Sequence, residues 1–302
     1  MAVNPVGATI DETRVRAFSE SVHMAAQQKK SRTKDISIIK YFKGKDMSYD
    51  GYGTVEATDA NARFAKLDFA DLEHNRRQIS PNRWQVTLPF DGRDAVEQFL
   101  DPKNGYEQVV ANAMMRRWDL TGIAALLASV NTGEDYGTAL TATADGVLEV
   151  DATAGLTYEK ILEARQNFID NDLIIDEDMD KSFMVISGKE HTQMMSEVEL
   201  TSGDYNREYF VEKGSIQKAA GFDIIKYAAN ATNPILELQA TDTERKCIAF
   251  TQDALCYGVQ EEIALEVRKL DDYINTYAVI ATGSFGAVRT EGKRVQQVTT
   301  TV

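Results

Sequence analysis

The residue types that most often perform chemistry are present in this chain, but none has the spacing that a catalytic site needs. The stretch Gly283-Ser-Phe-Gly286 places a serine between two glycines, yet it lacks the spacing of a nucleophile elbow and no histidine follows it. The three histidines, His23, His74 and His191, are too far apart in sequence for any two to have metal-ligand spacing. We therefore predict a protein that is not an enzyme and that holds no metal or cofactor.

An acidic run at residues 170–180 is the segment that most resembles a calcium loop. It contains six Asp and Glu, but apolar side chains occupy positions 173–175, where such a loop needs oxygen ligands and a central glycine. We interpret this run as a solvated loop. The two cysteines, Cys247 and Cys256, do not form a C-x-x-C pair, and we interpret them as small buried apolar residues.

The composition excludes several classes of protein. Of the 302 residues, 43% are apolar and 26% are charged, which is ordinary for a packed globular protein. No apolar run approaches the roughly 18–20 residues of a membrane-spanning helix, so we expect no membrane contact. The net charge of -14 argues against a protein that reads DNA sequence. This charge is uneven, because residues 1–50 carry nine Lys and Arg against six Asp and Glu, a balance of +3, and the remainder carries -17.

The first 90 residues show little of the pattern expected for a core. A basic stretch at 29–45 follows a short predicted helix at 11–28, and this combination is more typical of an arm than of a core element. Residues 41–90 combine Gly and Tyr with alternating segments at 64–69 and 84–90, which predict an extended two-stranded excursion. Such an element is marginally stable alone, so it must pack on something else, including another chain.

Regular helix and strand patterns follow in the rest of the sequence. Asp101-Pro102 is an N-cap and first-turn signal for a long helix over 103–130. Helices are also predicted over 157–169 and, more briefly, over 187–195. The residues from 292 to 302 are polar and rich in Thr, and we interpret them as a tail. Apolar runs predict strands at 147–150, 182–186, 222–225, 247–250, 263–267, 277–281 and 285–288.

Taken in this order, the segments resemble the major capsid protein of tailed bacteriophages, whose fold is shared with encapsulins and the floor of herpesvirus capsids. The resemblance extends over nearly the whole chain and is most specific at residues 155–165 and 214–225. Gln217 departs from the family pattern, which often has a second glycine there. The resemblance implies an α+β fold with an N-terminal arm, an extended β-hairpin loop, a peripheral domain with a long spine helix, and an axial domain.

The resemblance also implies domain boundaries and a function. The arm would be residues 1–40, the extended loop 41–90 and the axial domain 151–264, while 91–150 and 265–302 would form the peripheral domain. The implied function is self-assembly into hexamers and pentamers of an icosahedral phage head that encloses double-stranded DNA, with arm, loop and tail lying across neighbours. Two other classes stay open at this point, an encapsulin-type compartment shell and a soluble enzyme.

The implied partners are further copies of the chain, a portal protein, packaged double-stranded DNA bound without sequence preference, and a cement or decoration protein. Because the recognisable arm begins almost at Met1, we expect a separate scaffolding protein or none. The protein would be located in the capsid shell of the virion after assembly in the host bacterial cytoplasm. The candidate contacts between subunits or with the DNA at the inner face are Lys29, Lys30, Arg32, Lys34, Lys43, Lys45, Arg63, Arg76, Arg77 and Trp84.

Overall fold

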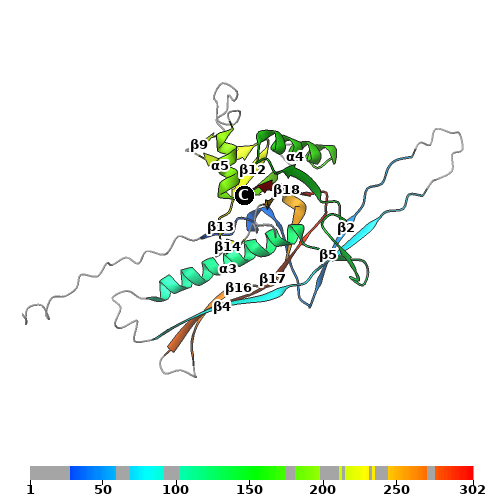
Figure 1. Ribbon diagram of the computed structural model, residues 1–302. Coiled ribbons are helices and arrows are strands. Elements are labelled where there is room, and N and C mark those ends of the chain that lie inside the picture. The colour runs from blue at the N-terminus through cyan, green and yellow to red at the C-terminus, as the bar shows by residue number, and fades with distance from the viewer. Residues whose placement is uncertain are drawn as a thin grey trace, which may run out of the picture.

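The computed structural model describes residues 28–58, 69–91, 102–174, 181–197, 211–212, 215–230, 233–234, 244–270 and 276–301. Two larger sheets, each with helices packed on it, form the body, and a smaller sheet extends from the body as a long hairpin (Figure 1). The mixture of helices and strands confirms the predicted α+β class. The helix predicted at 11–28 and most of the segment 64–69 lie outside the described residues.

The helices and strands have the following bounds. The helices are η1 (Lys34–Ile36), α3 (Pro102–Leu127), α4 (Tyr158–Asp170), α5 (Gly188–Ser196) and η2 (Gln252–Ala254), of which η1 and η2 are 3₁₀ turns. The strands are β1 (Ile38–Tyr41), β2 (Met47–Tyr52), β3 (His74–Ile79), β4 (Asn82–Asp91), β5 (Val130–Thr132), β6 (Thr138–Leu140), β7 (Leu148–Ala152), β8 (Ser182–Ile186), β9 (Val211–Glu212), β10 (Ser215–Ile216), β11 (Lys218–Ala219), β12 (Phe222–Lys226), β13 (Ala229–Asn230), β14 (Asn233–Pro234), β15 (Glu244–Thr251), β16 (Leu255–Lys269), β17 (Thr276–Arg289) and β18 (Val295–Thr301).

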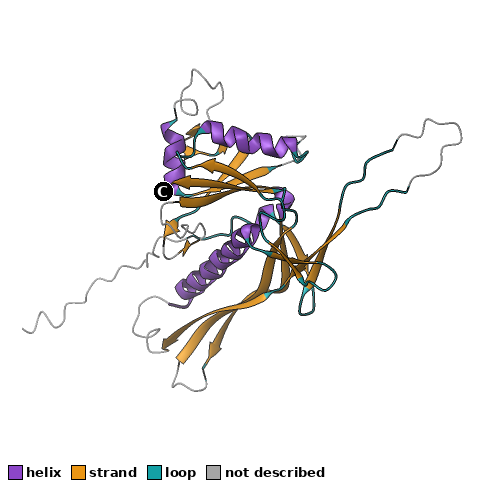
Figure 2. Cartoon of the chain, turned by 45° about the vertical axis from the view of Figure 1, so that its right-hand side comes forward, coloured by secondary structure: helices purple, strands orange, loops and turns teal. Residues whose placement is uncertain are grey.

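A four-stranded sheet in the order β1-β16-β17-β4 carries α3 along one face (Figure 2). β16, β17 and β4 pair antiparallel, whereas β1 pairs parallel with β16. Side chains from Trp84 to Phe90 alternate between the core and solvent, as the sequence predicts. α3 confirms the predicted long helix, and its buried side includes Val110, Met114 and Trp118. The helix and the sheet thus share one core.

A six-stranded sheet in the order β11-β12-β8-β15-β18-β7 forms the second core, with α4 and α5 packed on it (Figure 1). All five residues of β8 are buried, because the strand lies between β12 and β15 and both of its faces are covered. α4 buries Ile161, Ala164 and Phe168 against this sheet. α5 begins with a capping box between Ser187 and Glu190, which satisfies backbone donors at the start of the helix.

A third sheet has the order β2-β3-β5-β6. Its strands β2 and β3 form a hairpin that leaves the body (Figure 1). β2 and β3 pair antiparallel from Met47 opposite Ile79 to Tyr52 opposite His74. An extended two-stranded element was expected here, but its strands differ from the expected ones. The predicted strand at 84–90 is β4, which belongs to the four-stranded sheet because it pairs with β17 along its whole length.

Strand pairing groups the chain differently from the predicted segments at two places. β16 begins at Leu255, within the predicted axial range 151–264, but it pairs in the four-stranded sheet from its first residue. The predicted tail contains β18, which lies between β15 and β7 in the six-stranded sheet. Its polar composition suits this buried place because the Thr300 hydroxyl donates to Glu190 Oε1 at 3.3 Å. Among the described helices, none is long and apolar enough to cross a membrane.

Candidate interaction surfaces

The hairpin exposes apolar side chains in the segment that precedes residues 59–68 and in the segment that follows them. We use the name "hairpin" for β2, β3, residues 53–58 and residues 69–73. Phe69 is 95% exposed and Tyr52 is 71% exposed, and Val55 and Leu72 are exposed as well. Large apolar side chains gathered on one projecting element indicate a surface that another molecule covers.

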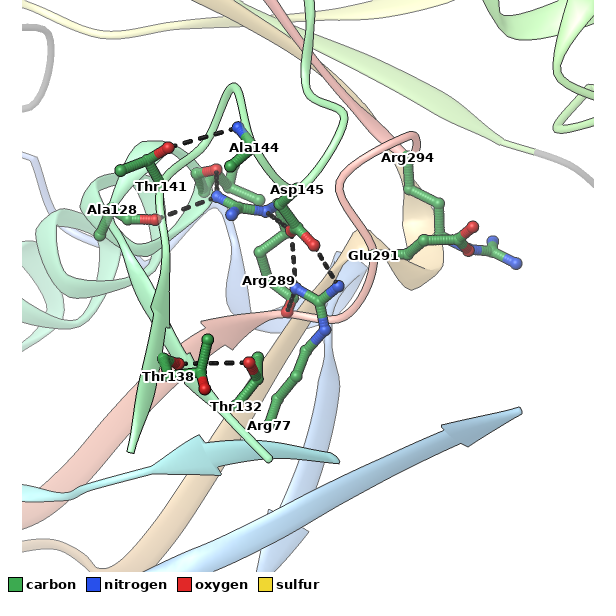
Figure 3. A network of polar contacts seen from close by, with 11 residues as sticks. Arg77, Ala128, Thr132, Thr138, Thr141, Ala144, Asp145, Arg289, Glu291 and Arg294 are labelled. Carbon is green, nitrogen blue, oxygen red and sulfur yellow. Dashed lines mark hydrogen bonds and ion pairs between the residues drawn. The ribbon is translucent and has the colours of Figure 1, made fainter. Parts of the chain in front are cut away.

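A buried ion network fixes the base of the hairpin to the body (Figure 3). Arg77 of β3 donates two hydrogen bonds to Asp145, from Nη1 to Oδ2 at 2.7 Å and from Nη2 to Oδ1 at 2.6 Å. Arg289, near the end of β17, donates from Nε to Asp145 Oδ2 at 2.7 Å. The two guanidinium groups and the carboxylate are all buried. Three segments that are far apart in sequence therefore meet at one carboxylate.

Arg289 also joins this network to the end of α3. Its Nη1 donates to the carbonyl of Leu126 at 2.6 Å and to the carbonyl of Ala128 at 3.1 Å. A cation at the C-terminus of a helix is favourable because it compensates the carbonyls that have no partner within the helix. Burial raises the pKa of the Asp145 carboxyl, but the hydrogen bonds from Arg77 and Arg289 outweigh burial and hold the pKa below its usual value.

A second buried carboxylate, Asp119 of α3, binds the start of the described chain. Asp119 is fully buried. The backbone N–H groups of Arg32 and Thr33 donate to it, at 3.0 Å to Oδ2 and 3.3 Å to Oδ1. The Thr33 hydroxyl donates to Oδ1 at 2.8 Å, and the side chains of Gln28 and Ser31 also donate to this carboxylate. The segment is therefore part of the body at this point.

Two buried tyrosines complete the surroundings of Asp119. The Tyr227 hydroxyl donates to Asp119 Oδ2 at 3.0 Å. The Tyr257 hydroxyl lies 2.8 Å from the Thr33 hydroxyl and donates to the carbonyl of Trp118 at 3.2 Å. Burial raises the pKa of both tyrosines, so both stay protonated and able to donate. Within the described residues, no Lys or Arg forms an ion pair with Asp119.

Nine of the ten predicted contact residues lie within the described residues. Lys29, Lys30, Arg32, Lys34, Lys43 and Lys45 are exposed, the first four on the segment bound to Asp119 and the other two between β1 and β2. Arg76 is exposed and pairs with Asp50 at 2.8 Å. Arg77 is buried in the network described above, so its guanidinium is not at the surface. Arg63 lies outside the described residues.

Trp84 lies in an aromatic and cationic stack within its own chain. The Arg117 guanidinium carbon is 3.6 Å from the centroid of the Trp84 ring, a cation–π contact between α3 and β4. The ring also packs against Phe285 with centroids 6.5 Å apart. The sequence predicts this tryptophan as an intermolecular contact, but the structure gives most of its surface to contacts inside the chain.

Sequence reasoning missed the residues that organise these surfaces, namely Asp119, Asp145, Arg289 and Arg117. For Asp119 a signal was available, because it falls on the apolar stripe of α3 beside Trp118 and one turn before Ile123. A carboxylate on a buried stripe requires partners. Asp145 and Arg289 carry no local signal, because their partners are distant in the sequence.

The remaining reactive groups are placed for packing. Burial raises the pKa of both cysteine thiols, that of Cys256 to about 11, which keeps them protonated and poorly nucleophilic at neutral pH. Nε2 of His191 accepts a hydrogen bond from the backbone N–H of Ile216 at 3.2 Å. The described residues contain no group of three or more His, Cys, Asp and Glu that could hold a metal ion. The buried polar groups of the described residues instead bind the start of the described chain, at Asp119, and the base of the hairpin, at Asp145.

A body of two sheets thus carries a hairpin that has exposed apolar side chains and a buried ion network at its base. The family model for phage capsid proteins matches residues 10–302, and the chain belongs to this family. Family membership supports a function as a major capsid protein of a bacteriophage, a structural protein of the head shell. A comparison with curated proteins gives no match.

Solved structures of phage heads share the fold over almost the whole chain. A chain in the capsid structure of the cyanophage P-SCSP1u matches with a TM-score of 0.74 and 14% identity, covering 99% of this chain and 96% of the other. A chain in the head structure of the Helicobacter pylori bacteriophage KHP40 matches with a TM-score of 0.74 and 10% identity, covering 99% of both chains. A chain in the capsid of Ralstonia phage GP4 matches with a TM-score of 0.70 and 11% identity, covering 99% and 98%. These matches confirm the fold implied by the resemblance.

Proposed function

We propose that this capsid protein assembles into hexamers and pentamers that close into an icosahedral phage head around double-stranded DNA. The observation that carries the proposal is the hairpin, whose apolar side chains, such as Phe69, have no core of their own. Its base is fixed by the Arg77–Asp145–Arg289 network, so these side chains are presented at a set position. A preorganised apolar element binds a neighbour with less loss of conformational entropy than a loose loop.

The two sheets suggest an assignment of the two domains. The four-stranded sheet with α3 corresponds to the peripheral domain, and the six-stranded sheet with α4 and α5 corresponds to the axial domain near the symmetry axes. Assembly takes place in the host bacterial cytoplasm, with a portal protein at one vertex. A separate scaffolding protein and a cement or decoration protein are further proposed partners. The Lys and Arg side chains exposed on residues 29–45 are proposed contacts with neighbours or with DNA.

Negative-stain electron microscopy of the purified chain and of Phe69→Asp tests the proposal. We expect shells or capsomers from the unaltered chain and neither from Phe69→Asp, because the substitution replaces an apolar contact with a carboxylate that would lose its hydration at the interface. Phe69 is 95% exposed in the single chain, so the substitution leaves the urea unfolding midpoint of unassembled subunits unchanged. Thr54→Asp is the matched control, because it adds the same charge at an exposed polar position of the hairpin.

Two outcomes would contradict the proposal. One is that Phe69→Asp forms shells as readily as Thr54→Asp. The other is a chain that stays monomeric under all conditions and has a radius of gyration of about 19 Å, which a compact protein of this length would have. The projecting hairpin requires a larger value for the free subunit (Figure 1).

A further inference from the structure

The segment of residues 28–34 has two chemically different sides. Its short polar groups, the side chains of Gln28, Ser31 and Thr33, point inwards and donate to Asp119. Its four long cationic side chains are exposed. These cations are Lys29, Lys30, Arg32 and Lys34. In a solvated charge run, nothing would hold the backbone, whereas here a buried carboxylate fixes it.

The fixed segment lies beside a groove that carries further cations. The groove has a volume of about 600 Å³ and lies between the segment and strands β11 and β12. Arg32, Lys218 and Lys226 line it. Among the described residues that line it, Asp223 is the one carboxylate, and it pairs with Lys218 at 3.4 Å.

Arg32 and Lys226 bring two like charges close together at this groove. The Arg32 guanidinium is held over the ring of Tyr227, 5.0 Å from its centroid, and its backbone N–H is bound to Asp119. Burial and the nearby Arg32 both lower the pKa of Lys226. Two cationic side chains therefore lie at the same groove, and a phosphate bound there would be attracted by both.

We propose that the Asp119-anchored segment and the adjoining groove form a preformed binding surface for the phosphate backbone of duplex DNA. The proposal rests on the proposed function, because it places DNA within reach of the assembled subunit. Exposed Lys and Arg side chains without sequence-reading groups are what non-specific phosphate binding requires. An acidic protein segment is disfavoured as the partner, because Lys is depleted in protein–protein interfaces and aromatic anchors are enriched there.

Asp119 acts here as a positioning residue with an unusual electrostatic signature. Asp119 is an anion beneath a cationic surface. If only net charge mattered, removal of its negative charge would strengthen DNA binding. If its role is to hold the cations in place, removal should instead weaken binding, because the segment must then be ordered when DNA binds. The two explanations predict opposite signs for one substitution.

Fluorescence anisotropy with a labelled mixed-sequence duplex and unassembled full-length subunits, at low and moderate salt, provides the measurement. We expect Asp119→Asn to weaken binding about fivefold or more, although it makes the protein less negative. Arg32→Gln should weaken binding and reduce the slope of log K against log salt by about 0.9, which corresponds to one lost phosphate contact. Lys269→Gln, an equal charge change at an exposed site at the end of β16, is the matched control and should have little effect.

Trypsin cleavage reports independently whether residues 28–34 have been released from Asp119. We expect Asp119→Asn to accelerate cleavage after Lys29, Lys30, Arg32 and Lys34 but not after Lys43 and Lys45. If Asp119→Asn does not fold, Tyr227→Phe serves as the second variant, because it removes one donor to Asp119 without changing any charge. It should weaken DNA binding in the same direction and to a smaller extent.

Three results would overturn the inference. Tighter or unchanged DNA binding by a folded Asp119→Asn variant would show that the anchor does not position the cations. A loss of affinity in Lys269→Gln equal to that in Arg32→Gln would show a diffuse charge effect. Equal affinity for a poly-glutamate peptide would indicate a protein partner. Shells that form normally while any of these holds would leave the proposed function intact, because DNA affinity is measured on unassembled subunits.

Discussion

Asp145 and Asp119 are both buried carboxylates that hold a distant segment on the body, yet they do so with different donors. Asp145 faces two guanidinium groups, which together bring more positive charge than it has negative charge. Asp119 accepts hydrogen bonds from amide and hydroxyl groups. The first joins the hairpin to α3 and β17, and the second joins the start of the described chain to α3. The contrast separates a joint that depends on a few strong ionic hydrogen bonds from one that distributes a charge over several neutral donors.

The physical basis of this contrast is the cost of leaving a partner behind. When Arg289 is removed, one charge-assisted hydrogen bond to Asp145 is lost and two carbonyls lose their donor, which together cost several kcal/mol. When one neutral donor to a carboxylate is removed, the remaining donors still solvate the charge, and the loss is about 1.5–3 kcal/mol. Substitutions of the partners of the two carboxylates should therefore lower the free energy of unfolding by different amounts.

Arg289→Met should reduce the stability of the subunit more than any other single change at either carboxylate. It leaves Asp145 with a single guanidinium partner and leaves the carbonyls of Leu126 and Ala128 without their donor. We expect the free energy of unfolding to fall by about 3–5 kcal/mol, measured by urea unfolding of unassembled subunits. Arg294→Met is the matched control, because its partly exposed ion pair with Glu291 should contribute at most about 1 kcal/mol.

The pH dependence of the same variant identifies the ion network as the cause. The folded-state pKa of Asp145 is below its ordinary value of 3.8, so its contribution to stability is present above pH 3.8 and is lost as the pH falls through the folded-state pKa. The difference in unfolding free energy between the unaltered chain and Arg289→Met should therefore narrow over this acid range. A difference that stays constant there would assign the loss to packing.

Gly292→Ala should break the Asp145 joint by a steric route. A Cβ at position 292 would lie 2.0 Å from the carbonyl oxygen of Asp145 and 2.5 Å from its carbonyl carbon. These are backbone atoms, which cannot rotate away as a side chain would. We expect a loss of about 3 kcal/mol, at the upper end for overpacking. Gly137→Ala is the control, because no atom lies within 4 Å of a Cβ there; equal losses in both would mean that the clash is relieved locally.

The sequence predicts those helices and strands in which apolar residues recur at regular spacing. α3 and β4 are predictable because their apolar residues recur at helical and at alternate spacing. β2 and β3 are not, because strands such as His74–Ile79 are mostly polar, and the pairing that defines them is between backbones. β18 has the composition of a tail, yet its Thr300 hydroxyl donates to Glu190 inside the body, a contact that composition does not reveal.

The candidate surfaces are less predictable than the fold. The basic side chains are visible as a run, but their orientation depends on Asp119, whose partners lie 86–91 residues earlier in the chain. Arg76 and Arg77 are indistinguishable as sequence neighbours. Strand geometry sends them to opposite faces, so one becomes a surface residue and the other an internal one.

Tyr227→Phe tests the Asp119 side of the contrast. It removes one neutral donor to a carboxylate that keeps its other hydrogen bonds. We expect the free energy of unfolding to fall by about 2 kcal/mol, less than for Arg289→Met. Urea unfolding gives the global value, and trypsin cleavage after Lys34 reports the anchor itself. Tyr158→Phe, on the partly buried outer part of α4, controls for loss of a tyrosine hydroxyl.

If Tyr227→Phe lowers the free energy of unfolding as much as Arg289→Met does, the type of donor does not set the strength of the contact, and the contrast between the two carboxylates fails.

Arg76→Ala should have the smallest effect, and it is informative because Arg77 is next to it. Both arginines form an ion pair with an aspartate, at 2.8 Å for Arg76 and 2.6 Å for Arg77. The Arg76 pair with Asp50 is exposed, so water and salt replace it at little cost, and we expect no measurable shift of the urea midpoint. Arg77→Ala should shift the midpoint strongly, because it leaves Asp145 buried beside a single cation. Equal shifts in the two variants would mean that burial at the base of the hairpin does not set the strength of the joint.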